Sequence, residues 1–207
     1  MTHSRFDKLN ASLRTSDLDA VILNPGPTLT YLSGLHFHLM ERPVVLLFAK
    51  DQDPAIVLPE LELQKVASLP YKLQVFSYPE NPSEWDAAFR KAVQALGLDG
   101  KRIGVEPRQL RLLEFRHVKA GAPEADYPDA SDVLSGLRLR KDKPEVDAMR
   151  RAVKIAQDAL EATIPFIKVG MTEKEVSSEL VVQLLKHGSE PEMPFSPTAK
   201  VRVKSEI

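Results

Sequence analysis

Hydrophobic and polar positions are arranged in two different ways along the chain. Up to about residue 130, short apolar runs alternate with amphipathic stretches. The apolar runs predict strands, and those without alternation are typical of strands covered on both faces. The expected strands are 19–23, 44–49, 55–58, 72–78 and 102–105, and the expected helices are 4–13, 59–68, 83–96 and 107–118. This alternation predicts an α/β layered domain.

Turn-forming residues separate these elements. Residues 51–54 (DQDP) are expected to form a hairpin-like turn between two apolar runs. The stretch 29–35 is ambiguous, and Gly34 is expected to end a short helical turn there. Residues 125–127 are a candidate for a last short strand.

The pattern changes after Asp132, because residues 132–188 contain no strand candidate. An apolar stripe with helical spacing runs from Val146 to Ile164. Two capping boxes, Asp142 with Glu145 and Thr172 with Glu175, predict where two helices begin. The tail is interrupted by prolines, and its alternation around residues 201–203 fits an edge strand or a frayed terminus equally well. We therefore expect two parts, residues 1–132 and 133–207.

Composition excludes several classes of protein. The chain of 207 residues has 28 basic and 29 acidic side chains and no basic block, which argues against nucleic-acid binding. No run of about 18 apolar residues is present, so no membrane span is expected, and the amino terminus lacks the apolar core of a signal peptide. The absence of cysteine excludes disulfides and thiolate zinc sites, and it fits a cytoplasmic protein.

Candidate chemistry is concentrated in residues 36–42. His36 and His38 would share one face of a strand, and together with Glu41 they are one candidate set of metal ligands. Two other interpretations of His36 and His38 are open: they are ordinary polar residues of a connecting segment, or they contact a substrate. Glu41 and Arg42 precede a buried strand, and so lie either at a functional rim of the sheet or in a solvated turn. No Gly-rich phosphate loop or Gly-x-Ser-x-Gly elbow is present, so the residues alone give no complete catalytic constellation.

Four segments in a fixed order nevertheless resemble a known family. They are residues 31–36 (YLSGLH), 41–43 (ERP), 137–146 (LRLRKDKPEV) and 169–176 (VGMTEKEV). In this order and spacing they resemble the Xaa-Pro peptidases, the prolidase and aminopeptidase P group of the creatinase-like metallopeptidases. The resemblance covers residues 1 to about 197.

The resemblance implies a creatinase-type amino-terminal α/β domain followed by the start of a pita-bread domain. In the family that second domain holds two divalent metal ions, manganese, cobalt or zinc, with two Asp, one His and two Glu. These ligands lie beyond the segment that resembles Phe195–Pro197, so none maps onto this sequence and the chain as given is expected to be inactive. The resemblance further implies that His36, His38, Glu41 and Arg42 belong to a lid that contacts a proline-containing peptide.

Two further expectations concern partners and an alternative function. The stripes of the two late helices, here without the sheet they pack on in the family, predict a homodimer. The alternative to the peptidase fragment is a stand-alone, non-catalytic module for peptide binding or assembly.

Overall fold

The computed structural model describes residues 2–190 and 202–203 and divides into two compact units, residues 1–140 and 141–207. The first unit contains helices, strands and two 3-10 helices in the order α1 Thr2–Thr15, β1 Ala20–Leu23, α2 Pro27–Ser33, β2 Val45–Ala49, β3 Ala55–Pro59, η1 Glu60–Val66, β4 Gln74–Tyr78, η2 Pro82–Glu84, α3 Trp85–Ala95, β5 Ile103–Val105, α4 Leu112–Gly121 and α5 Ser131–Leu139. The second contains α6 Lys143–Thr163, η3 Ile164–Phe166, α7 Glu173–Lys186, β6 Ser189–Glu190 and β7 Arg202–Val203.

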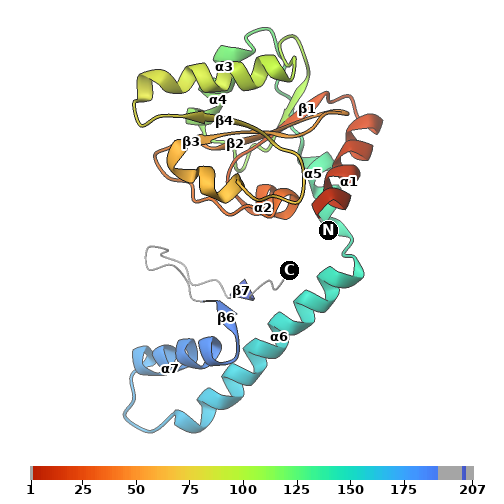
Figure 1. Ribbon diagram of the computed structural model, residues 1–207. Coiled ribbons are helices and arrows are strands. Elements are labelled where there is room, and N and C mark those ends of the chain that lie inside the picture. The colour runs from red at the N-terminus through yellow and green to blue at the C-terminus, as the bar shows by residue number, and fades with distance from the viewer. Residues whose placement is uncertain (1, 191–201, 204–207) are drawn as a thin grey trace. The chain divides into compact units, whose positions relative to one another are not determined.

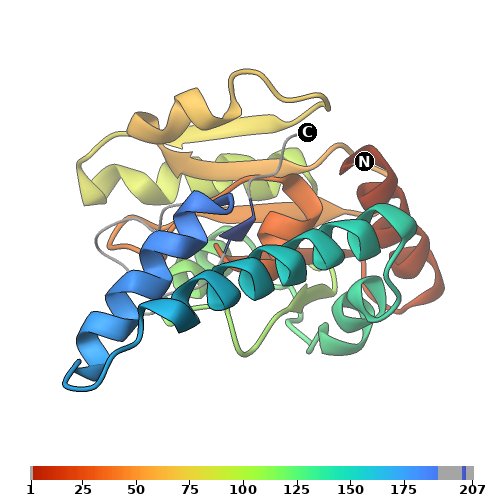
Figure 2. The same ribbon diagram turned by 90° about the horizontal axis from the view of Figure 1, so that it is seen from below.

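The first unit is built on a five-stranded sheet in the order β4-β3-β2-β1-β5. β2 is antiparallel to both β1 and β3, whereas β1 pairs parallel with β5 and β3 parallel with β4. Helices α1, α2 and α5 cover one face of the sheet, and α3 and α4 cover the other (Figures 1 and 2). This confirms the α/β layered fold.

Alternate residues of the central strands build two separate cores. In β2, Leu46 and Phe48 join the cluster under α1, α2 and α5, while Val45 and Leu47 join the cluster under α3 and α4. Every residue of β1, β2 and β3 is buried. Burial on both faces explains why these strands read as continuous apolar runs rather than as an alternation.

Several sequence predictions need correction. The helix predicted from residue 107 begins at Leu112, because Glu106–Leu110 forms a turn in which the amides of Gln109 and Leu110 both donate to the Glu106 carbonyl. The helix predicted for 59–68 is the 3-10 helix η1, which has no buried residue. Residues 125–127 form no strand, although Asp126 makes an isolated bridge to Arg102.

The boundary between the two units also differs from the sequence expectation of 132–133. Helix α5 belongs to the first unit because Leu134 and Leu137 are buried in the same core as α1 and α2. The Tyr31 hydroxyl donates to the Leu137 carbonyl at 3.1 Å, which further attaches α5 to this unit. The chain therefore leaves the first unit at Arg140.

The second unit contains the two helices expected from the late stripes. Both predicted capping boxes are formed. The Asp142 side chain accepts from the backbone amide of Glu145, and the Glu145 carboxylate accepts from the backbone amide of Asp142. Thr172 and Glu175 form the same pair of bonds. β6 pairs antiparallel with β7. β7 is the described part of the edge strand predicted around residues 201–203, and Val201 lies outside the described residues. None of the helices in the described ranges is long and apolar enough to cross a bilayer.

The packing around β5 yields a testable prediction. A Cβ on Gly104 would lie 2.7 Å from Leu18 Cδ1 and 2.8 Å from the Ala130 Cβ. We expect Gly104→Ala to lower the free energy of unfolding by about 1–3 kcal/mol, because the extra methyl overpacks a closed core. Urea unfolding followed by Trp85 fluorescence measures this.

Gly136→Ala is the matched control. Gly136 lies in α5, and no atom comes within 4 Å of a Cβ added there. This variant should gain about 0.5–1 kcal/mol, because alanine loses less backbone entropy in a helix than glycine does. Equal stabilities for the two variants would contradict the packing at Gly104.

Candidate functional site

Residues 36–42, hereafter the lid segment, connect α2 to β2. Helix α2 ends at Gly34, whose φ of 74° is a left-handed cap favoured by glycine. Because β2 is antiparallel to β1 and β3, the lid segment reaches the edge of the sheet where β1, β3, β4 and β5 end. Functional residues of α/β sheets gather at this carboxyl edge.

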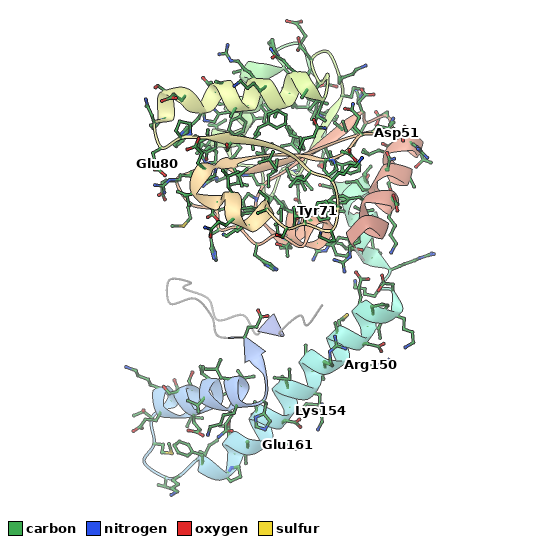
Figure 3. The ribbon with its side chains drawn as sticks, viewed as in Figure 1. Asp51, Tyr71, Glu80, Arg150, Lys154 and Glu161 are labelled. Atoms are coloured by element: carbon green, nitrogen blue, oxygen red, sulfur yellow. The ribbon has the colours of Figure 1, made fainter. Side chains whose placement is uncertain are left out.

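Arg42 is fixed by two carboxylates at this edge. Its Nε donates to both carboxylate oxygens of Glu80, at 3.1 and 3.0 Å, and Nη2 donates to Oε2 at 2.6 Å. Its Nη1 donates to Glu41 Oε1 at 2.6 Å. The hydrogen bond to Glu80 is the main cause that raises the pKa of the Arg42 guanidinium. Glu80 follows β4 and lies on the side of the unit away from Asp51 (Figure 3).

The two histidines lie on the surface of the lid segment. His36 and His38 are exposed, and the Phe37 between them is half-buried against the core. Lys65 Nζ donates to the His36 carbonyl at 3.3 Å and lies 5.0 Å from the centroid of the Phe37 ring. This contact fixes the backbone of the segment next to η1.

The structure does not assemble the metal site considered for His36, His38 and Glu41. The segment is not a strand, so the two histidines do not share the face on which that reading depended. Across residues 2–190 and 202–203, no group of three or more histidine or acidic side chains is placed to hold a metal ion. The donor set described here therefore does not fit a catalytic metal, and no chemical step in this chain is assigned to one.

Sequence reasoning missed a buried ion pair behind the lid segment. The Glu114 side chain on α4 is fully buried, and both its oxygens accept from Arg111 Nε at 3.0 Å. Arg111 Nη1 donates to the Met40 carbonyl of the lid segment at 2.6 Å. The spacing Arg-x-x-Glu is present in the sequence, but it does not show that the carboxylate is buried. Arg111 thus connects α4 to the lid segment.

Tyr78 secures the other end of the segment. Its hydroxyl donates to the Pro43 carbonyl at 2.7 Å, and burial is the main cause that raises the pKa of this phenol. The hydroxyl therefore stays protonated and remains a donor at physiological pH. Arg42, Glu80, Arg111 and Glu114 all act electrostatically on Tyr78, which places them in one neighbourhood.

The chemical groups of this arrangement suit hydrogen bonding to a peptide. The carboxyl edge presents guanidinium donors, two imidazoles and carboxylates on an anchored segment. Guanidinium groups bind carboxylates through paired hydrogen bonds, and imidazoles donate to or accept from peptide groups. The four residues 36, 38, 41 and 42 lie on one short segment, but the described contacts link only Glu41 and Arg42 to each other.

Two family profiles match the chain. The Creatinase/Prolidase N-terminal domain matches residues 5–140, and Metallopeptidase family M24 matches residues 147–207. The boundary between these matches coincides with the division of the structure into two units.

Individual relatives agree with these matches. The Xaa-Pro dipeptidase of Lactobacillus helveticus is 25% identical over 179 residues, which is 86% of this chain and 48% of that protein. The putative dipeptidase YkvY of Bacillus subtilis is 22% identical over 89% of this chain and 51% of its own length. The chain thus spans about half the length of the curated relatives it matches.

Solved structures share the fold. A recombinant prolidase from Thermococcus sibiricus superimposes with a TM-score of 0.79 at 20% identity, over 92% of this chain and 51% of that chain. A proline dipeptidase from Streptococcus pneumoniae is 27% identical with a TM-score of 0.56, and the match covers 66% of this chain and 98% of that chain.

Proposed function

Because the chain belongs to the creatinase/prolidase N-terminal domain family, we propose that it acts as the amino-terminal part of an Xaa-Pro dipeptidase or aminopeptidase P-like enzyme in the cytoplasm. The reaction is hydrolysis of the peptide bond before proline. The match to the M24 metallopeptidases, which are metal-dependent, supports this, as does the similarity to Xaa-Pro dipeptidases. Two divalent ions, manganese, cobalt or zinc, would belong to the intact enzyme.

This chain's contribution is substrate recognition by the lid segment. The observation that carries the proposal is an anchored segment with exposed side chains. Arg111 donates to the Met40 carbonyl and Tyr78 to the Pro43 carbonyl, so Glu41 and Arg42 lie between these two anchors. His36 and His38 precede the first anchor and are exposed. Anchored loops position functional groups without paying to order them on binding.

Each candidate residue has a role in this proposal. His36 and His38 contact the peptide groups of the substrate. Arg42 binds its carboxylate through paired hydrogen bonds, exchanging the exposed Glu80 for the substrate, and Glu41 keeps the guanidinium oriented. The exchange is feasible because an ion pair this exposed contributes little stability.

The purified chain is expected to bind an Xaa-Pro dipeptide through the lid segment without hydrolysing it. In an NMR titration, Leu-Pro should shift the His36 and His38 ring signals, and Leu-Pro amide, which lacks the carboxylate, should bind several-fold more weakly. No proline should be released with added manganese, cobalt or zinc, because a catalytic metal needs three or more protein ligands.

Arg42→Gln should abolish the preference for the free carboxylate. Arg102→Gln is the matched control, since Arg102 pairs with Asp17 and Asp126 on an exposed surface elsewhere in the first unit. Equal shifts with the dipeptide and its amide in the wild type would contradict the role of Arg42. Metal-dependent turnover that persists after removal of contaminating peptidases would contradict the proposal that this chain binds the dipeptide without hydrolysing it.

The proposal includes a homodimer. Its support is an exposed apolar face that runs along α6 to the first residue of η3. Met149, Val153, Leu160 and Ile164 on this face are each more than half exposed. Patches of this kind mark protein interfaces in soluble proteins.

A further inference from the structure

A groove of about 790 Å³ lies at the opposite edge of the sheet from the lid segment. It runs between α1, the β2–β3 turn and the stretch that leads into β4. Its lining includes Asp51, which follows the end of β2 opposite to the lid segment, and Tyr71, which precedes β4. Asp51 and Tyr71 lie on the α1 side of the unit, and Glu80 lies on the other (Figure 3). The volume is in the range of small-molecule sites.

Aromatic rings form a rigid wall of the groove. Phe6 stacks on Phe48 with centroids 5.5 Å apart, and its ring meets the edge of Tyr71 at 5.1 Å. The Tyr71 hydroxyl donates to the Ser33 carbonyl at 2.7 Å. Burial raises the pKa of Tyr71 to about 12, so this donor persists at physiological pH. The rings are therefore fixed before any ligand arrives.

The polar wall is also fixed in advance. Asn10 Nδ2 donates to Asp51 Oδ1 at 2.9 Å, and the Asp51 amide donates back to Asn10 Oδ1 at 2.9 Å. Arg14 donates to the same carboxylate oxygen of Asp51. These bonds hold Asp51 at a φ of 61°, which is rare for a residue other than glycine. Since Arg14 already pairs with Asp51, neither is a free charge for a ligand.

The remaining charges in the groove are unequal. Asp7 and Asp53 contribute two carboxylates, and Lys72 contributes one ammonium; within the described residues these three side chains form no ion pair. Asp7 shares a face of α1 with Asn10 and Arg14, at helical spacing. The groove thus combines aromatic rings with an excess of unpaired negative charge.

We propose that this groove binds a guanidinium group carried on an aliphatic stem. The stem packs against the half-buried ring of Tyr71, which the buried Phe6 contacts, and the planar cation pairs with the exposed carboxylates of Asp7 and Asp53. Guanidinium groups suit both surfaces, because they bind carboxylates in a bidentate manner and pack on aromatic rings. Such a group belongs either to a small metabolite or to an arginine side chain of a polypeptide.

Calorimetric titration of the full chain tests the proposal with three probes. They are butylguanidinium, the neutral isostere butylurea, and the peptide acetyl-Gly-Arg-Gly-amide. We expect butylguanidinium to bind at least about tenfold more tightly than butylurea, because the charge strengthens each hydrogen bond. Tighter binding of the peptide would identify an arginine side chain as the ligand, and tighter binding of butylguanidinium a small molecule. Failure of both cations to bind, or equal binding of butylurea, would overturn the proposal.

Variants locate the binding in this groove. The double variant Asp7→Asn/Asp53→Asn should weaken butylguanidinium binding about tenfold or more, whereas Asp132→Asn, an exposed aspartate of α5, should leave it unchanged. Lys72→Gln should strengthen binding, because it removes the opposing charge. Weakening by Asp132→Asn equal to that of the double variant would overturn the location. Leu-Pro binding at the lid segment is a separate readout that these variants should not affect.

Discussion

Arg111→Ala is expected to lower the free energy of unfolding of the first unit by about 3–5 kcal/mol. The substitution removes the cation that pairs with Glu114, whose side chain is fully buried. A buried charge without a partner is far more costly than the pair was favourable. Because the Arg111 side chain is itself 31% exposed, the lower end of the range is expected. Urea unfolding measures the change.

A second substitution separates the buried charge from other losses. Adding Glu114→Gln to Arg111→Ala should recover a large part of the stability, because the uncharged amide costs less to bury. Arg102→Ala is the control: it removes two exposed ion pairs in the same unit and should cost only about 0–1 kcal/mol. If Arg111→Ala and Arg102→Ala cost the same, Glu114 is not a buried charge in solution.

The same variant tests the anchoring of the lid segment. Arg111 Nη1 donates to the Met40 carbonyl, so its loss should release the backbone around this residue. Hydrogen exchange of the amides between residues 38 and 43 should become faster in Arg111→Ala, while those of β2 should keep their protection relative to the rest of the unit. Unchanged exchange in the lid segment would show that Tyr78 alone holds it.

Local interactions explain which parts of the fold could be predicted from the sequence. The two helices that begin after Asp142 and Thr172 depend on side chains three residues apart. Both partners of each capping box can therefore be identified in the sequence. The strands β2 and β3 are buried on both faces, so their apolar runs needed no further context. The turn at 51–54 follows from its polar composition and its place between those runs.

Long-range contacts explain what could not be predicted. The residues before α4 are held out of the helix by partners far away in the sequence: Gln109 Nε2 donates to the Pro25 carbonyl, and Arg111 donates to Met40. No local pattern shows either contact, so the apolar spacing after Pro107 was read as helix. The burial of Glu114 is likewise not visible from its spacing to Arg111. Residues 36–42 could be singled out by residue type, but their irregular backbone could not be foreseen.

The groove beside α1 illustrates the same limit. For the first part of the chain, the sequence predicts only a short amphipathic helix over residues 4–13. One face of this helix becomes a wall only when Asp51 and Tyr71 are brought opposite by the sheet. Sequence spacing therefore gave the face of the helix, and the topology of the sheet supplied what it faces.

The chain is expected to self-associate as a twofold dimer through α6. Met149, Val153, Leu160 and Ile164 recur at helical spacing, and each is between 52% and 57% exposed. Other positions of α6 are already covered: Ala159 and Thr163 are buried, and α6 packs against α7. Leaving about 400 Å² of apolar surface in water forgoes about 10 kcal/mol at ~25 cal/mol per Å². Identical chains most often cover such a face by twofold pairing.

Light scattering at micromolar concentration measures the outcome, with the monomer at 23.1 kDa as reference. Val153→Glu/Leu160→Glu should convert the dimer to monomer, because two charges would be buried in the interface. Arg151→Glu, an exposed position on the polar face of α6, is the matched control and should stay dimeric. In the monomeric variant, the amides of α6 and α7 should exchange much faster than those of the first unit, since only Ala159 and Thr163 of the two helices are buried. A wild type that is strictly monomeric and binds no apolar dye would refute the dimer, because the face would then be covered within one chain.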